Sequence, residues 1–167
     1  MTSSAKPDAR WLVECGEWPT LEAQRAAARS LLFRLLGGEV SVAHDSRGAP
    51  YLPGRPGLFV SLSHCRRAVA AAVSRERRVG IDVESRRRVS DSLVERVCSP
   101  DELALVRASA DPTMAFLRLW TRKEAVLKCR GTGIRGFSSM QSALVAADFE
   151  IIDIDCENPD VVASLAL

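Results

Sequence analysis

The sequence predicts an α+β protein, because segments with strand-like alternation and segments with helical periodicity both occur along the chain. Strands are expected at residues 58–63, 69–73 and 79–84, although the alanines of the middle segment leave a helix open there. Two helix-start signals follow, with N-caps at Ser99 and Asp111 and a proline directly after each. A length of 167 residues favours one compact unit.

The composition is typical of a soluble globular protein, with 47% apolar residues, 26% charged residues and a formal net charge of +2. The longest apolar run, residues 68–73, is too short to cross a bilayer, and the first ten residues contain no apolar signal core. Five scattered cysteines without a C-x-x-C motif indicate reduced thiols rather than a zinc site or disulfides. We therefore expect a monomeric, cytoplasmic protein that binds neither nucleic acid nor membrane.

Local capping and turn signals predict the remaining elements. A helix, for example, should begin after Thr20 and stop at Gly37, since glycine is common just past a helix end. The further predicted elements are strand 11–15, helix 21–36, strand 40–42, turn 45–48, extended loop 49–57, helix 90–97, helix 99–107, a long helix opened by Asp111 and ended by Gly131, loop 131–136, and strands 142–146, 149–155 and 161–165.

The most informative stretch lies around residues 117–128. At helical spacing one side is an apolar stripe of Phe116, Leu119, Trp120, Val126 and Leu127, and the opposite side carries Arg118, Thr121, Arg122 and Ala125. Lys123 projects into the apolar stripe. Glu124 lies at the edge of the stripe, and Lys128 lies on the same edge one turn after Glu124. Charges beside an apolar stripe usually have partners or a ligand, because unpaired buried charge is costly. A surface helix with one Glu–Lys pair is the alternative, since long side chains can extend past a stripe to water.

Three carboxylates predict a shared site with these lysines. In G-I-D-V-E, residues 80–84, strand periodicity places Asp82 and Glu84 on one face. Together with Glu124 they would repel one another, so a common site needs a cation or raised pKa values. An all-oxygen set suits Mg²⁺, or Mn²⁺ in its place, and Lys123 and Lys128 beside that ion predict a pyrophosphate ligand.

Other polar residues are open to two interpretations. Ser63 and His64 end a predicted strand near a basic cluster, which fits a phosphate monoester, although a lone strand-end histidine is more often only hydrogen-bonded. Arg29 and Ser30 lie on the first helix, where a single arginine is normally solvated. Arginine-rich runs before residue 79 and at 86–88 indicate either solvated surface or a site for phosphate or an acidic protein.

Three motifs follow one another along the chain: S-L-S-H-C at 61–65, G-I-D-V-E at 80–84 and W-T-R-K-E-A-V-L-K at 120–128. Together they resemble the signatures of the 4′-phosphopantetheinyl transferases, and the single-chain, surfactin-type branch matches best. The resemblance implies transfer of the phosphopantetheine arm of coenzyme A to a serine of an acyl, peptidyl or aryl carrier protein of fatty-acid, polyketide or nonribosomal peptide synthesis. Adenosine 3′,5′-bisphosphate is the other product.

The resemblance also implies the architecture, a pseudo-dimer of two similar α+β halves with the active site between them. The halves would be residues 1–77 and 78–167, meeting near residues 74–79.

Carried over position by position, the resemblance assigns a role to each matching residue. Asp82, Glu84 and Glu124 would hold Mg²⁺. Lys123 and Lys128 would neutralise the pyrophosphate of coenzyme A, which Asp82 would also approach. The remaining coenzyme A contacts would be Ser63 and His64 at the 3′-phosphate, Gly48 and Pro50 in the adenine-side loop, and Arg29 and Ser30 on the first helix.

The chain departs from the family pattern before the first helix, where the paired basic residues often found in the family are missing, and at two later positions. The family's loop motif G-K-P is Gly48-Ala49-Pro50 here, so a lysine is missing, and Arg47 or Arg55 is a candidate substitute. Arg87 is a candidate replacement for a lysine that commonly follows the D-x-E strand.

The expected mechanism needs a base, because a carrier serine is a poor nucleophile until it is deprotonated. Glu124, directly or through water on the metal, is the first choice, and Lys128 would hold the phosphate and stabilise the leaving bisphosphate. Carrier proteins are generally acidic, so arginines 86–88 would speed their encounter. An Mg²⁺-dependent phosphohydrolase of nucleotide-like substrates and a non-catalytic carrier-binding module are the alternatives. A hydrolase would cleave coenzyme A without any carrier.

Overall fold

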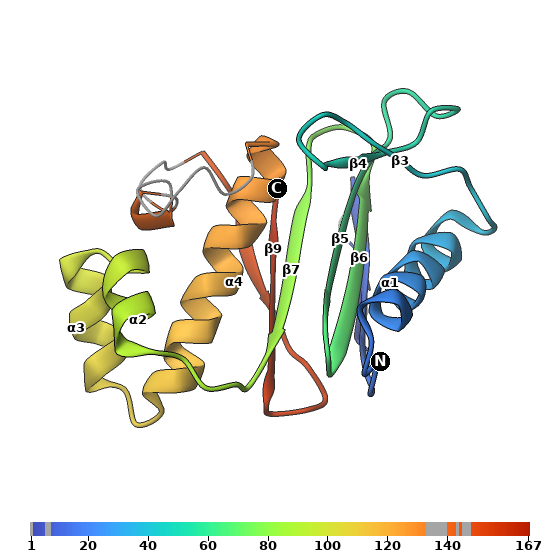
Figure 1. Cartoon of the computed structure of the whole chain (residues 1–167). Coiled ribbons are helices and arrows are strands. Elements are labelled where there is room, and N and C mark those ends of the chain that lie inside the picture. Colours follow the sequence, from blue (N-terminus) through green and yellow to red (C-terminus); the bar gives the residue numbers. More distant parts are fainter. Residues whose placement is uncertain (1, 6–7, 133–139, 143, 145–147) are drawn as a thin grey trace.

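Two β-sheets lie face to face, with helices on their outer sides (Figure 1). The computed structural model describes residues 2–5, 8–132, 140–142, 144 and 148–167. In chain order the elements are β1 (Thr2–Ala5), β2 (Ala9–Cys15), α1 (Leu21–Leu36), β3 (Ala43–His44), β4 (Pro50–Tyr51), β5 (Phe59–Cys65), β6 (Ala68–Ser74), β7 (Gly80–Ser85), α2 (Asp91–Val97), α3 (Pro100–Ala108), α4 (Pro112–Arg130), β8 (Ile151–Ile154) and β9 (Val161–Ala166). This combination of helices and sheets confirms the mixed α/β composition that the sequence predicts.

The first sheet is antiparallel, with strand order β1-β2-β6-β5, and α1 covers its outer face. The helix has the predicted bounds, because the Thr20 side chain caps its first turn and Gly37 ends it at a φ of 76°. Segment 69–73 is a strand, β6, rather than a helix. All seven of its residues are buried, and alanines let helix and second sheet approach its two faces closely.

The second sheet has the antiparallel order β7-β9-β8, and α4 packs on its outer face with α2 and α3 beyond (Figure 1). Each of these helices starts as predicted, on the capping side chains of Ser90, Ser99 and Asp111. A Cβ at Gly80 would overlap the backbone of Ala125, so only glycine lets β7 come this close to α4.

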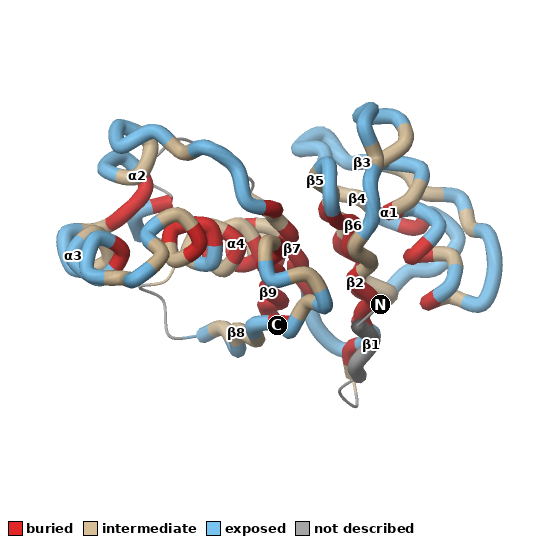
Figure 2. The backbone as a smooth tube through the Cα atoms, turned by 90° about the horizontal axis from the view of Figure 1, so that it is seen from below, coloured by how far each residue is buried: buried red, intermediate tan, exposed pale blue. Residues whose placement is uncertain are grey.

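The core is layered: one cluster of buried residues lies between the two sheets, a second lies between the first sheet and α1, and others lie around α4. Figure 2 shows buried residues on both sheets and on the helices that cover them. Strands β5 and β7, one from each sheet, lie side by side at the junction of the sheets. There Ser61 Oγ accepts a hydrogen bond from the Ile81 amide at 3.0 Å, and Ser63 Oγ accepts one from the Val83 amide at 3.3 Å. We call this junction the seam. No helix of the described segments is long and apolar enough to cross a membrane.

Some predicted elements differ from the structure. Residues 40–42 are not a strand; pairing begins at Ala43, where the turn held by Asp45 brings β3 against β4. In segment 142–146, Ser142 and Leu144 lie in turns rather than in a strand, and the other residues are outside those described. Of the predicted loop 131–136, residues 133–136 lie outside the described residues.

The prediction that Thr121 and Ala125 lie on the polar side of α4, opposite the apolar stripe, was wrong. Both are fully buried against the second sheet, where Thr121 Oγ1 and Ser164 Oγ share a 2.9 Å hydrogen bond. The helix is buried on two sides, by the sheet and by α2 with α3, so no single apolar stripe describes it.

Candidate active site

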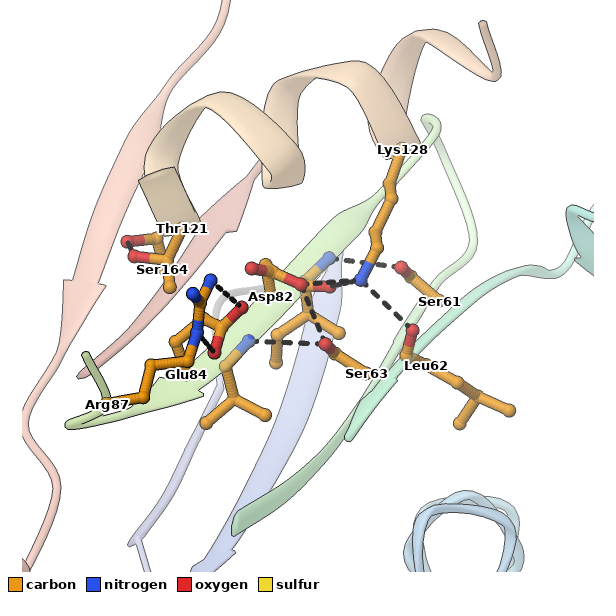
Figure 3. Close-up of polar contacts among 11 residues, drawn as sticks. Ser61, Leu62, Ser63, Asp82, Glu84, Arg87, Thr121, Lys128 and Ser164 are labelled. Carbon is orange, nitrogen blue, oxygen red and sulfur yellow. Dashed lines mark hydrogen bonds and ion pairs between the residues drawn. The ribbon is translucent and has the colours of Figure 1, made fainter. Parts of the chain in front are cut away.

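Asp82 is the centre of a polar cluster at the seam (Figure 3). Its neighbours Ile81 and Val83 point into the core between the sheets, so strand alternation places Asp82 on the face that meets α4. Its Oδ1 accepts hydrogen bonds from Ser63 Oγ and Lys128 Nζ, each at 2.7 Å. Its Oδ2 is buried and finds no hydrogen-bond partner among the described residues. Because an unpaired buried oxygen is costly, this atom favours a cation or a donor from a ligand.

Lys128 extends from α4 across the seam. Besides Asp82, its ammonium donates to the carbonyl oxygens of Ile81 at 3.0 Å and Leu62 at 3.4 Å. One lysine therefore contacts both edge strands, β5 and β7, and its side chain is still 29% exposed. The fold thus holds the ammonium at the seam with three acceptors, and the side chain is partly exposed.

Glu84 and Glu124 lie near enough to Asp82 for the three charges to interact. Burial and the negative charge of Asp82 raise the pKa of Glu124 to about 7, against the opposing effect of Lys128. Burial also raises the pKa of Glu84, while its ion pair with Arg87, at 3.3 Å, lowers it. The structure thus brings the three predicted carboxylates together. In the described part of the chain, however, no three Asp, Glu, His or Cys side chains are arranged to hold a metal ion.

A cavity of about 550 Å³ opens beside this cluster between α1, β5 and the β3–β4 segment. Four residues predicted to bind coenzyme A line it: Arg29, Gly48, Pro50 and His64. Sequence reasoning missed Arg25 and His44, which also line it. Arg25 is one helical turn before Arg29, a spacing that places both on one face of α1 and was available in the sequence. The lining is therefore basic, which suits a phosphorylated ligand.

His64 is held at the edge of this cavity by a 3.2 Å hydrogen bond between its Nδ1 and Gln24 Oε1. Burial lowers the pKa of His64, and the positive charges of Lys128 and Arg25 lower it further. These effects favour the neutral form of the ring.

Lys123 is not part of the cluster. It is fully buried on the far side of α4, where its Nζ donates to Glu102 Oε2 at 2.6 Å and to the Val97 carbonyl at 2.9 Å. The structure therefore does not support the predicted contact of Lys123 with pyrophosphate. The sequence contained a signal for this partner, because Glu102 is the acidic residue of the predicted capping box at Ser99.

Two other residues differ from their predicted places, and a third makes a contact that was not predicted. Ser63 points toward Asp82 across the seam, not into the cavity that His64 lines. Ser30 is exposed on α1 and is not among the lining residues of the cavity. Arg47, the candidate substitute for the missing loop lysine, donates to the Gly131 carbonyl at 3.2 Å and so connects the loop to the end of α4.

Comparison with known proteins shows that the segment carrying this cluster matches a protein family. A model of the 4′-phosphopantetheinyl transferase superfamily matches residues 78–163, which include β7 and α4. The 4′-phosphopantetheinyl transferase HetI of Nostoc sp. is 38% identical over 136 residues, 75% of this chain and 57% of that protein. AcpT of Salmonella typhi is 34% identical over 125 residues, 72% of this chain and 65% of that protein.

The match to a third relative covers a larger share of that protein's length. The 4′-phosphopantetheinyl transferase psf-1 of Bacillus pumilus is 31% identical over 170 residues, 86% of this chain and 72% of that protein. The chain spans less than two thirds of the length of HetI and AcpT. The matched region nevertheless contains the strand and the helix that supply Asp82, Glu84, Glu124 and Lys128. The chain therefore belongs to the 4′-phosphopantetheinyl transferase superfamily.

Proposed function

We propose that this protein transfers the 4′-phosphopantetheine arm of coenzyme A to a serine of an apo acyl, peptidyl or aryl carrier protein in the cytoplasm. The supporting observation is the position of the Asp82–Lys128 pair between a basic cavity and two further carboxylates. The basic cavity suits the phosphorylated nucleotide of coenzyme A, and the Lys128 ammonium suits its diphosphate.

We further propose that the fold is a pseudo-dimer with halves 1–77 and 78–167, as in the single-chain, surfactin-type branch. Two features support this division. Each half contains a main antiparallel sheet, of four or three strands, and one long helix on its outer face, α1 or α4. The cluster around Asp82 draws residues from both halves, Ser63 from the first and Lys128 from the second.

The carboxylates suit a divalent cation, and we propose Mg²⁺, with Mn²⁺ as a substitute. Asp82 Oδ2 is a buried oxygen that finds no donor among the described residues. Burial, and after it the negative charges of Asp82 and Glu84, raise the pKa of Glu124, and a cation would offset the repulsion among these charges. Asp82, Glu84 and Glu124 would hold the ion, with Glu84 released from its pair with Arg87. The ion would supply Lewis-acid stabilisation of the diphosphate.

The chain's own residues would then perform the transfer. The carrier serine attacks the phosphorus that bears pantetheine, and the bond from that phosphorus to the nucleotide's phosphate oxygen breaks. Glu124, directly or through water, takes the serine proton as the general base. Lys128 stabilises the charge that leaves with adenosine 3′,5′-bisphosphate. Ser63, which donates to Asp82 Oδ1, keeps that carboxylate oriented.

The test is mass spectrometry of an apo acyl carrier protein and an apo peptidyl carrier protein after incubation with coenzyme A and MgCl₂. We expect the wild type to add the arm and Asp82→Ala to be slower by about 100-fold or more, since charge stabilisation at the reacting phosphates is lost. MgCl₂ should also raise the melting temperature of the wild type but not of Asp82→Ala. Asp155→Ala, at an exposed aspartate near the end of β8, is the control.

Two results would overturn the proposal. One is a transfer rate of Asp82→Ala equal to that of the control. The other is release of phosphopantetheine from coenzyme A at the same rate with and without a carrier, which is the behaviour of a hydrolase.

A further inference from the structure

A second cavity, of about 410 Å³, opens at the ends of β5 and β7. We call it the arginine groove; its lining includes Cys65, Arg66, Arg67, Glu84, Ser85 and Arg87. His64 lines the first cavity and Cys65, the next residue of β5, lines the groove. Because successive strand residues point to opposite faces, the two cavities open on opposite faces of β5. Glu84 belongs both to the groove and to the carboxylate cluster.

The charge of the groove is positive, and two of its arginines are exposed and can contact a partner. Arg87 is paired with Glu84, and Arg86 is held by Asp111 and Asp160, so the predicted rim 86–88 is partly neutralised. Arg66 and Arg67, in the turn between β5 and β6, are exposed. Arg67 has only a 3.7 Å pair with Glu17, and Arg66 forms no ion pair within the described residues.

The side chains of Arg66 and Arg67 are not needed to form their turn. The turn is fixed by backbone bonds, from the Trp18 amide to the Arg66 carbonyl at 2.8 Å and from the Gly16 amide to the Arg67 carbonyl at 3.1 Å. Two guanidinium groups are thus presented to solvent at the mouth of the groove by a rigid turn.

The geometry of phosphoryl transfer indicates which reactant uses the groove. The attacking and leaving oxygens lie roughly in line on opposite sides of the phosphorus. If the leaving nucleotide occupies the basic cavity on one face of β5, approach of the acceptor serine from the other face, where the groove reaches Glu84, satisfies this geometry.

We infer that the arginine groove docks the carrier protein, with Arg66 and Arg67 binding acidic residues that flank its acceptor serine. This inference rests on the proposed function and names the surface on which its macromolecular substrate binds. The pantetheine arm is the other candidate occupant, but it is uncharged and gains nothing from two solvated guanidinium groups. Complementary charge at the edge of an interface speeds association and sets its salt dependence.

The test compares Arg66→Glu/Arg67→Glu with the control Arg75→Glu. Arg75 is exposed and directly follows β6, whereas Arg66 and Arg67 directly precede it, so the control reverses an arginine charge at the other end of the strand. Binding is measured by fluorescence anisotropy with an apo acyl carrier protein and an apo peptidyl carrier protein whose acceptor serine is alanine. Coenzyme A binding is measured by calorimetry. Transfer to the intact carriers is measured in parallel.

We expect the double variant to bind the carrier about tenfold more weakly than the control and with less dependence on salt, while coenzyme A binding stays unchanged. Equal carrier binding by the double variant and the control would overturn the inference. Weaker coenzyme A binding by the double variant would also overturn it and would assign the groove to the pantetheine arm. Absence of transfer by the wild type, with the binding difference intact, would instead overturn only the proposed function.

Discussion

Glu124 shows at the scale of a single residue how position determines chemistry. An exposed glutamate is ionised at neutral pH, but burial beside Asp82 raises the pKa of Glu124 to about 7. Lys128, one turn further along α4, lowers this pKa only in part. A carboxyl group that titrates near neutrality suits a general base, and it also makes the fold sensitive to pH.

We predict that Glu124→Gln reduces the pH dependence of stability. A carboxyl group with a raised pKa in the folded state binds its proton more tightly there than in the unfolded chain. Its stabilising effect is therefore complete below about pH 4.5 and is lost as the pH rises to about 7. The unfolding free energy from urea denaturation should fall over this range in the wild type and fall less in Glu124→Gln. Equal slopes for Glu124→Gln and the exposed control Glu39→Gln would contradict the prediction.

At the scale of elements, Lys123 shows how one buried charge joins three helices. Its ammonium, on α4, contacts the carbonyl of Val97 at the end of α2 and the carboxylate of Glu102 in the first turn of α3. Glu102 Oε2 also accepts the Ser99 amide at 2.7 Å, so the ion pair and the helix cap share one oxygen. The pair has a structural role because it fixes α2 and α3 against the helix that carries Glu124 and Lys128.

We predict that Lys123→Met lowers the unfolding free energy by about 3–5 kcal/mol, because Glu102 and the Val97 carbonyl lose their buried donor. The double variant Lys123→Met/Glu102→Gln should recover part of this loss, since no unpaired charge remains. The neighbouring Arg122→Met is the control: it removes an ion pair with Asp153 that is 40% and 39% exposed and should cost at most about 1 kcal/mol. Denaturant unfolding gives all three values, and a loss in Lys123→Met no larger than that of Arg122→Met would disprove the structural role.

At the scale of the whole molecule, the seam explains how two sheets become one active site. β7 pairs through its backbone only with β9 among the described strands, so its other edge would leave amides without partners beside β5. The hydroxyl oxygens of Ser61 and Ser63 accept hydrogen bonds from the amides of Ile81 and Val83. They thus take the place of the backbone carbonyls that a neighbouring strand would supply. Ser63 also donates to Asp82, which links the joining of the sheets to the orientation of the central carboxylate.

We predict that Ser61→Ala lowers the unfolding free energy by about 1–3 kcal/mol, because the buried Ile81 amide loses its acceptor. Ser74→Ala is the matched control. The Ser74 hydroxyl is equally buried, at 1% exposure of the residue, but has no hydrogen-bond partner in the described structure, so its removal should change stability by less than about 0.5 kcal/mol. Chemical denaturation should separate the two variants, and equal losses would contradict the role given to the seam.

The sequence by itself determined those features that depend on near neighbours. The bounds of α1 and the starts of α2, α3 and α4 followed from the capping side chains of Thr20, Ser90, Ser99 and Asp111, which act within one turn. The alternation in residues 80–84 correctly separated Ile81 and Val83, in the core, from Asp82 on the opposite face. The motifs also gave the family, because they contain the strand and helix that the superfamily shares.

Only the tertiary structure decided which distant groups share an environment. A helical wheel gives the angle of Lys123 on α4 but not that α2 and α3 cover that angle, and so it could not separate an ion pair from a phosphate contact. For the same reason, the sequence did not indicate that Arg25 and His44 line the basic cavity. Nor did it indicate that the Ser63 hydroxyl donates to Asp82 instead of pointing into that cavity. Periodicity fixes the direction of a side chain relative to its own element, whereas its partner, burial and pKa depend on elements far away in the sequence.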